Sequence, residues 1–331
     1  MHADKTKQLD LPDPSSGLDQ CLKKRAVLAV VVASSTPNSQ NLLPPTAVEA
    51  TGFFQAAQKQ PVSGFRQGRW FEGDDWIADE VPVALEFNGI SHAVMLATPL
   101  DLDEFALGFA LSEGIINTQN ELYGVDEVAS ELGITLQLHI ASAAFERLKS
   151  RRRTLAGRTG CGLCGTESLH HVARDLPALP GTLEQPAISR LAVAQAMSNL
   201  GALQILHRAT GAVHAAAWCS RQGNVQCLRE DVGRHNALDK LIGALASSKV
   251  DPSTGFIAVT SRASFEMVQK TVAAGVPLLA AVSAPTLLAI KTAQRLRMTL
   301  VGFARQQDMV VFSHPERLDM AEAPYCHAMS N

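Results

Sequence analysis

Two cysteines separated by two residues are the most reactive feature of the sequence. Cys161 and Cys164 lie in the segment GCGLCG, in which three of six residues are glycine. Glycine permits many backbone conformations, so such a loop can present both sulfur atoms. Six basic residues occupy positions 147–158, and no acidic residue lies between Arg147 and Glu167. Because nearby positive charge favours the nucleophilic thiolate, the pattern is typical of cysteines that do chemistry.

Four interpretations of the cysteine pair are compatible with the sequence. In a sulfur relay, one thiolate takes up an activated sulfur as a persulfide and delivers it, and the second cysteine helps release it. A structural zinc site needs two further ligands, for which Cys219 and Cys227 are available. A thioredoxin-type motif would follow the first strand of a βαβ unit, whereas this pair follows an arginine-rich linker. The fourth interpretation is a loop with two inert thiols.

The remaining cysteines are less informative. Cys219 and Cys227 are expected to be small core residues, since free cysteine is commonly buried. Cys21 and Cys326 fall in terminal segments. The relay interpretation therefore depends on Cys161 and Cys164 alone.

Polar residues also gather where predicted strands end. The segment REDVGRHN (229–236) lies between a strand and a helix, so Arg234 and His235 are candidates for binding an anion at the helix N-terminus. The alternative is a salt-bridged solvent loop. Ser261 and Arg262 follow the next strand and predict a second anion or phosphate cradle, unless Ser261 or Ser264 simply caps the helix. No P-loop motif is present, and no GxGxxG motif opens a helix after a strand.

The second half of the chain alternates strands with helices of about ten residues. This order predicts an α/β domain with a parallel or mixed sheet and helices on its faces. Ligands bind at the carboxyl ends of strands in such sheets. The predicted strands span 212–218, 225–229, 256–260, 278–282, 299–304 and 309–312, so their carboxyl ends include Ser261, Ser283 and Arg305.

The first half predicts a small α+β unit over residues 79–145. Alternating residues on both sides of Asn88-Gly89 indicate a hairpin. Asp101 and Glu104 resemble a capping box at the start of a helix that ends near Gly114. We expect a loose extension at 1–60, an α+β domain at 61–150, a basic cysteine loop at 151–170, an α/β domain at 171–318 and a tail at 319–331.

Composition narrows the classes of function. The 331 residues carry a net charge of −3 and 46% hydrophobic residues, which is typical of a globular protein and excludes a globally basic nucleic-acid binder. Aromatic residues make up only 5%, so stacking on single strands is not expected. Six cysteines are too few for a disulfide scaffold. No apolar run is long enough to span a membrane, and the short run at 26–33 is not expected to be a signal peptide.

Several segments taken together resemble the formate dehydrogenase accessory sulfurtransferase family, FdhD/NarQ. The matching segments occur in the family's order and are EFALGF (104–109), CGLCG (161–165), REDVGRHNALDK (229–240), SRASFE (261–266), SAPT (283–286) and GFAR (302–305). The long REDVGRHNALDK segment makes the resemblance specific.

The resemblance implies a cytoplasmic homodimer that receives sulfur from a cysteine desulfurase. It implies transfer of that sulfur from a persulfide on Cys161, with Cys164 as its partner, to the bis-molybdopterin guanine dinucleotide molybdenum cofactor, which then enters formate dehydrogenase. It also implies a three-layer C-terminal domain similar to the cytidine deaminase fold. The family's cofactor contact corresponds to Phe303, Ala304, Arg305, Gln306, Gln307 and Asp308. The same pocket is expected to include Arg234, His235, Ser261 and Arg262. A guanine nucleotide is also expected to bind in it. A cofactor chaperone without sulfur transfer is the main alternative.

Overall fold

The computed structural model describes residues 56–156, 175–180 and 187–320. Cys161 and Cys164 lie outside these ranges, as do Cys21, Cys326 and most of the predicted N-terminal extension. The described residues form the scaffold on both sides of the cysteine loop in the sequence.

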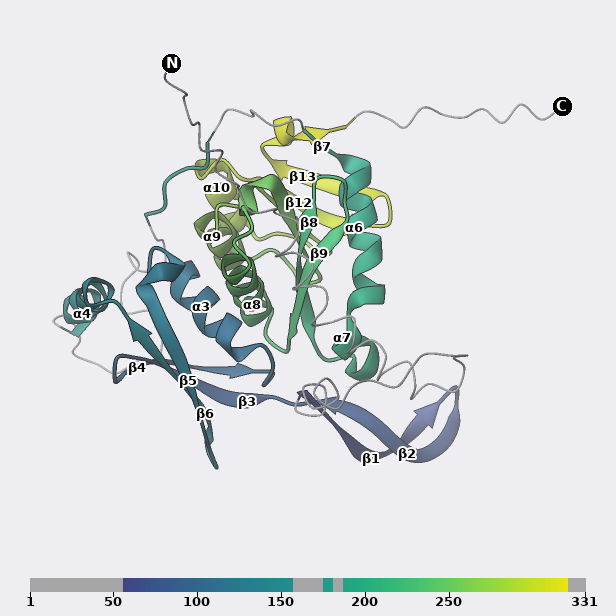
Figure 1. The fold of residues 1–331 in the computed structure, drawn as a ribbon. Coiled ribbons are helices and arrows are strands. Elements are labelled where there is room, and N and C mark those ends of the chain that lie inside the picture. The colour runs from purple at the N-terminus through teal and green to yellow at the C-terminus, as the bar shows by residue number, and fades with distance from the viewer. Residues whose placement is uncertain (1–55, 157–174, 181–186, 321–331) are drawn as a thin grey trace, which may run out of the picture.

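A six-stranded mixed sheet forms the centre of the C-terminal part (Figure 1). Its order is β13-β12-β11-β10-β8-β9, with β10, β11 and β12 parallel to one another. All five residues of β10 are buried, as expected of a strand that is covered on both faces. The strands are β8 (His214–Ser220), β9 (Val225–Asp231), β10 (Gly255–Val259), β11 (Leu278–Ala281), β12 (Thr299–Arg305) and β13 (Asp308–Ser313).

Helices cover both faces of this sheet, which confirms the predicted three-layer α/β/α arrangement. One apolar cluster joins the sheet to α8 (Arg234–Ser247), α9 (Phe265–Ala273) and α10 (Leu287–Arg295). A second cluster joins the opposite face to α6 (Arg190–Leu203), which is followed by the short α7 (Ile205–Thr210). A parallel pair, β7 (Ile188–Ser189) with β14 (Leu318–Asp319), lies at the edge of the second cluster. The likeness to the cytidine deaminase fold stays a prediction.

A four-stranded sheet of order β4-β3-β6-β5 forms the predicted α+β unit. It comprises β3 (Val81–Phe87), β4 (Ile90–Ala97), β5 (Leu122–Ser130) and β6 (Gly133–Ile140), and α3 (Leu102–Ser112) packs on one face. Asn88 and Gly89 turn between β3 and β4 with φ of 46° and 81°. The predicted hairpin is confirmed, because this left-handed pair matches the twist of the two strands.

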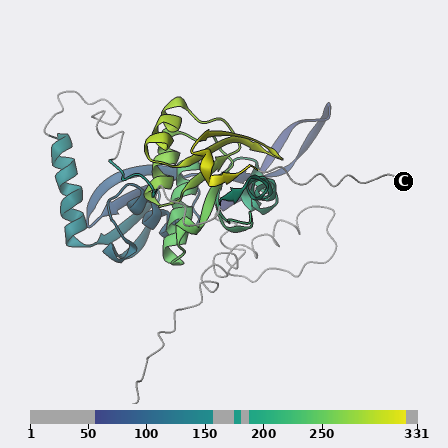
Figure 2. The same ribbon diagram turned by 90° about the horizontal axis from the view of Figure 1, so that it is seen from above.

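Two elements differ from the sequence prediction. A hairpin of β1 (Ala57–Arg66) and β2 (Arg69–Ala78) begins inside the segment expected to be loose, and it projects from the body in both views (Figures 1 and 2). Its residues are mostly exposed, so it has no core-facing alternation that the sequence would reveal. The arginine-rich stretch expected to be a linker continues a helix, α4 (Ser142–Ala156).

The predicted capping box is wrong. Asp101 precedes α3 with φ of 56° and its side chain caps no backbone N–H. The Glu104 carboxylate instead accepts hydrogen bonds from the Arg229 guanidinium on β9, with a distance of 2.8 Å from Nη2 to Oε1. Arg229 Nε also donates to Glu104 Oε2, so the pair is bidentate, and two parallel bonds from a buried cation outweigh the single bond that a backbone N–H would donate.

Two glycines bring α3 and α8 into direct backbone contact. A Cβ atom added to Gly108 would lie 1.7 Å from the Asp239 carbonyl oxygen, and one added to Gly243 would lie 1.9 Å from the Glu104 carbonyl oxygen. Any side chain at either position would force the helices apart. The α+β unit and the α/β domain are thus packed through this crossing.

Candidate functional site

Most of the REDVGRHNALDK segment is a buried ionic joint and not an anion site or a solvent loop. Lys240 and Asp231 are both fully buried, with 2.6 Å between Nζ and Oδ2. Lys240 also donates to the Thr98 carbonyl at 2.8 Å, and the Asp231 carboxylate accepts from the backbone N–H groups of Thr98 and Gly233. A salt-bridged solvent loop is therefore wrong for Asp231, because the end of β4 packs against this residue and buries it.

The same segment makes two further buried ion pairs, one with α3 and one with α9. Arg229 pairs with Glu104 as described above, and Asp239 pairs with Lys270 of α9 at 3.0 Å. Burial by itself would lower the pKa of Lys270, but the Asp239 and Glu113 carboxylates outweigh it and raise that pKa. The lysine is therefore charged. It also pairs with Glu113 at the end of α3 at 2.6 Å, so this ion pair and the Arg229–Glu104 pair join the two units.

Arg234 and His235 differ from their neighbours because they lie at the start of α8, at the carboxyl edge of the sheet. The Arg234 Nε is buried and has no hydrogen-bond partner among the described residues. His235 Nε2 lies 2.6 Å from the Glu266 carboxylate and 3.4 Å from the Ser264 hydroxyl. The hydrogen bond from His235 lowers the pKa of Glu266. The Arg234 Nε is thus an unpartnered donor of a cationic side chain beside a helix N-terminus, a position that favours anions.

Ser261 and Arg262 end β10 at the same edge. Neither helix-cap alternative holds, since the Ser261 hydroxyl donates to the Arg262 carbonyl and Ser264 makes no capping bond. Ser261 is buried whereas Arg262 is exposed. Half-buried His214 begins β8 at this edge, and burial together with the charge of Arg234 lowers its pKa, so its imidazole is neutral at neutral pH.

A continuous series of contacts connects these residues to the β12–β13 turn. Ala263 pairs with Pro285 in a parallel bridge, and the Thr286 amide donates to the Ala263 carbonyl. One strand further along, the Phe303 amide donates to the Ser283 carbonyl, and Arg305 Nε donates to the Val282 carbonyl at 3.1 Å. The structure thus brings the predicted cofactor-contacting residues, from Arg234 to Arg305, to one edge.

The turn itself carries backbone strain. Phe303 has φ of 52° and its side chain is 44% exposed, although a bulky residue rarely adopts this conformation. Gln306 is also left-handed, with φ of 55°. Ala304 is buried, whereas Arg305, Gln306, Gln307 and Asp308 are exposed. Phe303 lies at an irregularity in the pairing of β12 with β13, and strained backbone clusters at ligand sites, so its exposed ring is a candidate ligand contact.

The remaining cysteines in the described ranges do not form a zinc site. Cys227 belongs to the apolar cluster beneath α8 and α9, and Cys219 belongs to the cluster on the opposite face of the sheet. Two ligands on opposite faces cannot hold one ion, so zinc coordination by this pair is ruled out. Burial raises the pKa of the Cys219 thiol, which makes it a poor nucleophile.

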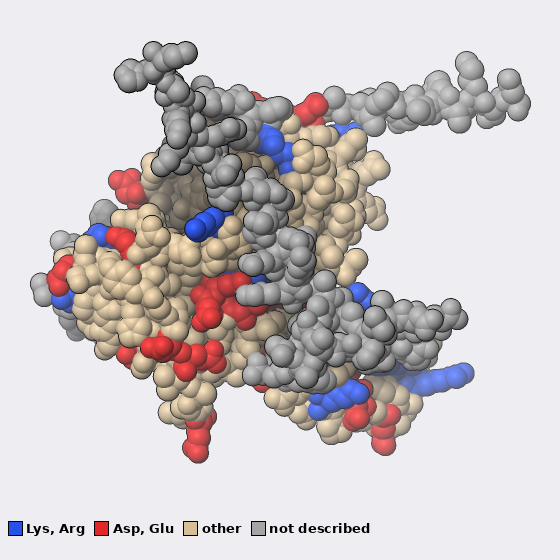
Figure 3. Space-filling view, viewed as in Figure 1, with Lys and Arg blue, Asp and Glu red and all other residues tan. Residues whose placement is uncertain are grey.

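Part of the basic stretch before the cysteine loop is already neutralised. Arg147 donates two hydrogen bonds to the Glu121 carboxylate, at 3.0 and 2.9 Å, and Lys149 pairs with Glu146. In the view of Figure 3, acidic side chains gather near the middle of the face, and the blue side chains of the described residues lie scattered. Arg147 and Lys149 therefore contribute less positive charge to the surroundings of the cysteine loop than the sequence predicts.

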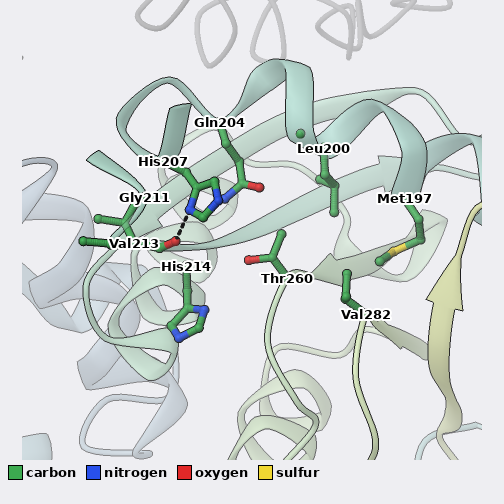
Figure 4. Close-up of a pocket in the computed structure, with 11 residues that line it drawn as sticks. Met197, Leu200, Gln204, His207, Gly211, Val213, His214, Thr260 and Val282 are labelled. Carbon is green, nitrogen blue, oxygen red and sulfur yellow. Dashed lines mark hydrogen bonds between the residues drawn. The ribbon is translucent and has the colours of Figure 1, made fainter. Parts of the chain in front are cut away.

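A pocket of about 520 Å³ lies beside this edge and was not predicted. It is lined from α6 and α7 by residues that include Gln204 and His207, and from the strand ends by Thr260 and Val282. The helices at 190–210 were not predicted from the sequence, so their polar residues were not considered as candidates for a binding site. In the structure, the break between α6 and α7 at Gln204 marks the position of this pocket (Figure 4).

The described ranges hold neither a metal-binding cluster nor a membrane-spanning helix. No group of three or more His, Cys, Asp or Glu side chains there is arranged to hold a metal ion. Among the helices described, none combines the length and the hydropathy needed to cross a membrane.

Comparison with known proteins agrees with this arrangement. The FdhD/NarQ family model matches residues 78–319. The sulfur carrier protein FdhD of Variovorax paradoxus is 66% identical over 264 residues, which cover 80% of this chain and 94% of that protein. The FdhD protein of Xanthomonas euvesicatoria is 48% identical over 289 residues, covering 87% of this chain and 98% of that protein.

A solved structure shows the same fold. It belongs to a protein described as a formate dehydrogenase accessory protein, from Desulfotalea psychrophila, with a TM-score of 0.60 and 23% identity over 80% of this chain and all of that one. The family match spans both sheets, the α3–α8 crossing and the residues gathered at the carboxyl edge. The chain belongs to the FdhD/NarQ family.

Proposed function

We propose that this protein is a sulfur carrier that takes sulfur from a cysteine desulfurase and transfers it to the bis-molybdopterin guanine dinucleotide molybdenum cofactor before that cofactor enters formate dehydrogenase. The names of its relatives support sulfur carriage, and the name of the solved structure supports the link to formate dehydrogenase. The observation that carries the cofactor part is the carboxyl edge, where Arg234, Arg262 and Arg305 lie with an exposed, strained Phe303.

The sulfur steps balance as two exchanges. The Cys161 thiolate attacks the outer sulfur of the donor persulfide, a new S–S bond forms, and the donor cysteine leaves as a thiolate. Cys164 then attacks the inner sulfur of the Cys161 persulfide and releases the outer sulfur as hydrosulfide for the molybdenum. The two thiols become a disulfide in that step, and a small-molecule thiol must reduce it before the next cycle.

The carboxyl edge would hold the cofactor as cargo during this transfer. Its phosphates are anions, which suits the unsatisfied Arg234 at the N-terminus of α8 and the exposed Arg262. His235 and Ser261 would complete this wall. The turn from Phe303 to Asp308 would contact the organic part through the exposed ring and its polar neighbours. A guanine nucleotide would compete for this edge, and a cytoplasmic homodimer is the form in which we expect the protein to act.

Replacing Phe303 by glycine should separate the binding role from stability. Glycine adopts φ of 52° without strain, which offsets the lost contact with the Phe312 ring. We expect the free energy of unfolding in urea to change by less than about 1 kcal/mol. Loss of the ring should lower the rate of cofactor-dependent activation of formate dehydrogenase roughly tenfold, the effect of losing one stacked aromatic contact.

Arg297→Gly is the matched control for this variant. Arg297 is also exposed and left-handed, with φ of 56°, but it precedes β12 at the opposite edge of the sheet. It should leave activation unchanged. Equal loss in both variants, or full activation by Phe303→Gly, would contradict a cofactor contact at this turn.

A further inference from the structure

The β1–β2 hairpin carries two exposed aromatic rings at its tip. Phe65 is 71% exposed and Trp70 is 58% exposed. The two residues face each other across the strands, with 5.2 Å between their ring centroids in an edge-to-face arrangement. Aromatic side chains, tryptophan above all, supply much of the binding energy of a protein interface when the partner buries them. The tip is therefore a candidate interaction surface.

The positive charge at the tip is only partly neutralised. Gln67 and Gly68 form the turn, with φ of 52° and 75°, and an arginine stands on each side of it. The Arg66 guanidinium pairs with the Asp75 carboxylate at 2.8 Å. Arg69 is exposed and makes no ion pair with any described residue. A partner that offers a carboxylate beside an apolar slot would pair with Arg69 and bury the two rings together.

The base of the hairpin lies beside the carboxyl edge of the six-stranded sheet. Buried Ala57 shares an apolar cluster with Val213, and half-buried Val232 packs against the same cluster. Val213 directly precedes His214 of the edge, and Val232 lies two residues before Arg234. Ten residues per strand give an arm of roughly 33 Å, at about 3.3 Å per residue. A partner that contacts both the tip and the edge must therefore have the size of a protein.

The position of the hairpin favours the recipient of the cargo over the sulfur donor. The helix α4 leads toward the cysteine pair, since its last residue lies five positions before Cys161. In both views α4 and the hairpin lie at opposite ends of the molecule (Figures 1 and 2). We expect a donor that loads Cys161 to approach from the side of α4. The recipient must instead reach the cargo at the carboxyl edge, beside which the hairpin begins.

The charges of the hairpin argue against two other occupants of the tip. Two copies of the chain that met tip to tip would bring their Arg69 side chains together, and like charges at an interface oppose association. Side chains alternate between the faces of a strand, so Glu72 and Asp74 follow Trp70 on the face that carries both rings. An anionic membrane surface would repel these two acids.

We propose that the β1–β2 hairpin is the docking arm for the protein that receives the cargo. Phe65 and Trp70 enter an apolar slot on formate dehydrogenase, and Arg69 pairs with a carboxylate beside that slot. The assignment rests on the proposed function, because formate dehydrogenase is the recipient named there. The FdhD/NarQ family model begins at residue 78, after the tip, as expected of a surface that fits one particular recipient.

Surface plasmon resonance of the full chain on immobilised formate dehydrogenase that lacks its molybdenum cofactor tests this assignment. We expect the unaltered chain to bind. Phe65→Ser combined with Trp70→Ser should raise the Kd about thirtyfold, as is typical when a dominant aromatic contact is lost. Arg69→Glu keeps both rings but repels the carboxylate of the partner. It should raise the Kd about tenfold, an effect that shrinks as salt is added.

Tyr123→Ser combined with Leu132→Ser is the matched control. These residues are 73% and 87% exposed, and they belong to β5 and the turn after it, on the separate four-stranded sheet. This variant should bind like the unaltered chain. Light scattering should show the same oligomeric state for all four proteins.

Four results would overturn the docking role: no binding by the unaltered chain, normal binding by the hairpin variants, an equal loss in the control, or a changed oligomeric state in the hairpin variants. Binding to phosphatidylglycerol vesicles that the double hairpin variant loses would assign the tip to a lipid surface instead. Persulfide formation on Cys161 does not require the hairpin, so its persistence would separate a failure here from a failure of sulfur carriage.

Discussion

A Cys161→Ala variant is expected to reduce activation of formate dehydrogenase to the level of cells that lack the protein. Alanine has no nucleophile, and Cys219 is a poor substitute, because it is buried with a raised thiol pKa on the α6 face of the sheet. The Cys164→Ala variant should retain part of the activity, since an external thiol can release the outer sulfur in place of Cys164. The measurement is the rate of formate oxidation in cells whose own copy is deleted.

Cys326→Ala is the control for the loss of a thiol. It lies in the C-terminal tail, outside every segment that resembles the family. This variant should restore full activity. Full activity of Cys161→Ala would show that the protein supports the cofactor without carrying sulfur, as the chaperone alternative requires.

A Lys240→Met variant is expected to lose about 3–5 kcal/mol of unfolding free energy, the usual cost of breaking a buried ion pair. Methionine fills the space of the lysine side chain but leaves the Asp231 carboxylate without its cation, 2.6 Å away and fully buried. The Thr98 carbonyl would lose its donor as well. Urea unfolding followed by circular dichroism measures the loss.

Lys291→Met is the matched control for Lys240→Met. Lys291 is exposed on α10, and surface substitutions usually change stability by less than about 0.5 kcal/mol. If the two variants unfold at the same urea concentration, the ionic joint contributes nothing to stability. The role assigned here to REDVGRHNALDK would then be wrong.

The sequence predicted the α/β domain well because its strands are buried on both faces. Continuous apolar runs such as 256–260, followed by polar residues and an amphipathic helix, leave few alternatives. The β1–β2 hairpin was not predicted, since its two strands face solvent on most sides and carry no periodic apolar pattern. The helices at 190–210 were not predicted, because no helical pattern of apolar residues was identified in that segment.

The candidate site was predicted in position but not in the roles of its charges. Strand ends located Ser261, Arg262 and Arg305 correctly at one edge, because parallel topology brings those ends together. Arg234 and His235 of REDVGRHNALDK lie at that edge, whereas Glu230 accepts from two backbone N–H groups of α7. The buried ion pairs are made by Arg229, Asp231, Asp239 and Lys240. Only the partners Thr98 and Glu104, more than 120 residues earlier in the chain, decide which charges are buried.

Mass spectrometry of the persulfide tests the central claim most directly. The full chain, Cys161→Ala and Cys164→Ala are each incubated with a cysteine desulfurase and free cysteine, and the peptide that contains residues 161–164 is weighed. A gain of one sulfur atom on Cys161 in Cys164→Ala, which lacks the cysteine that releases it, with no gain in Cys161→Ala, is the predicted result. No gain in Cys164→Ala, or an equal gain in Cys161→Ala, would contradict sulfur carriage by Cys161.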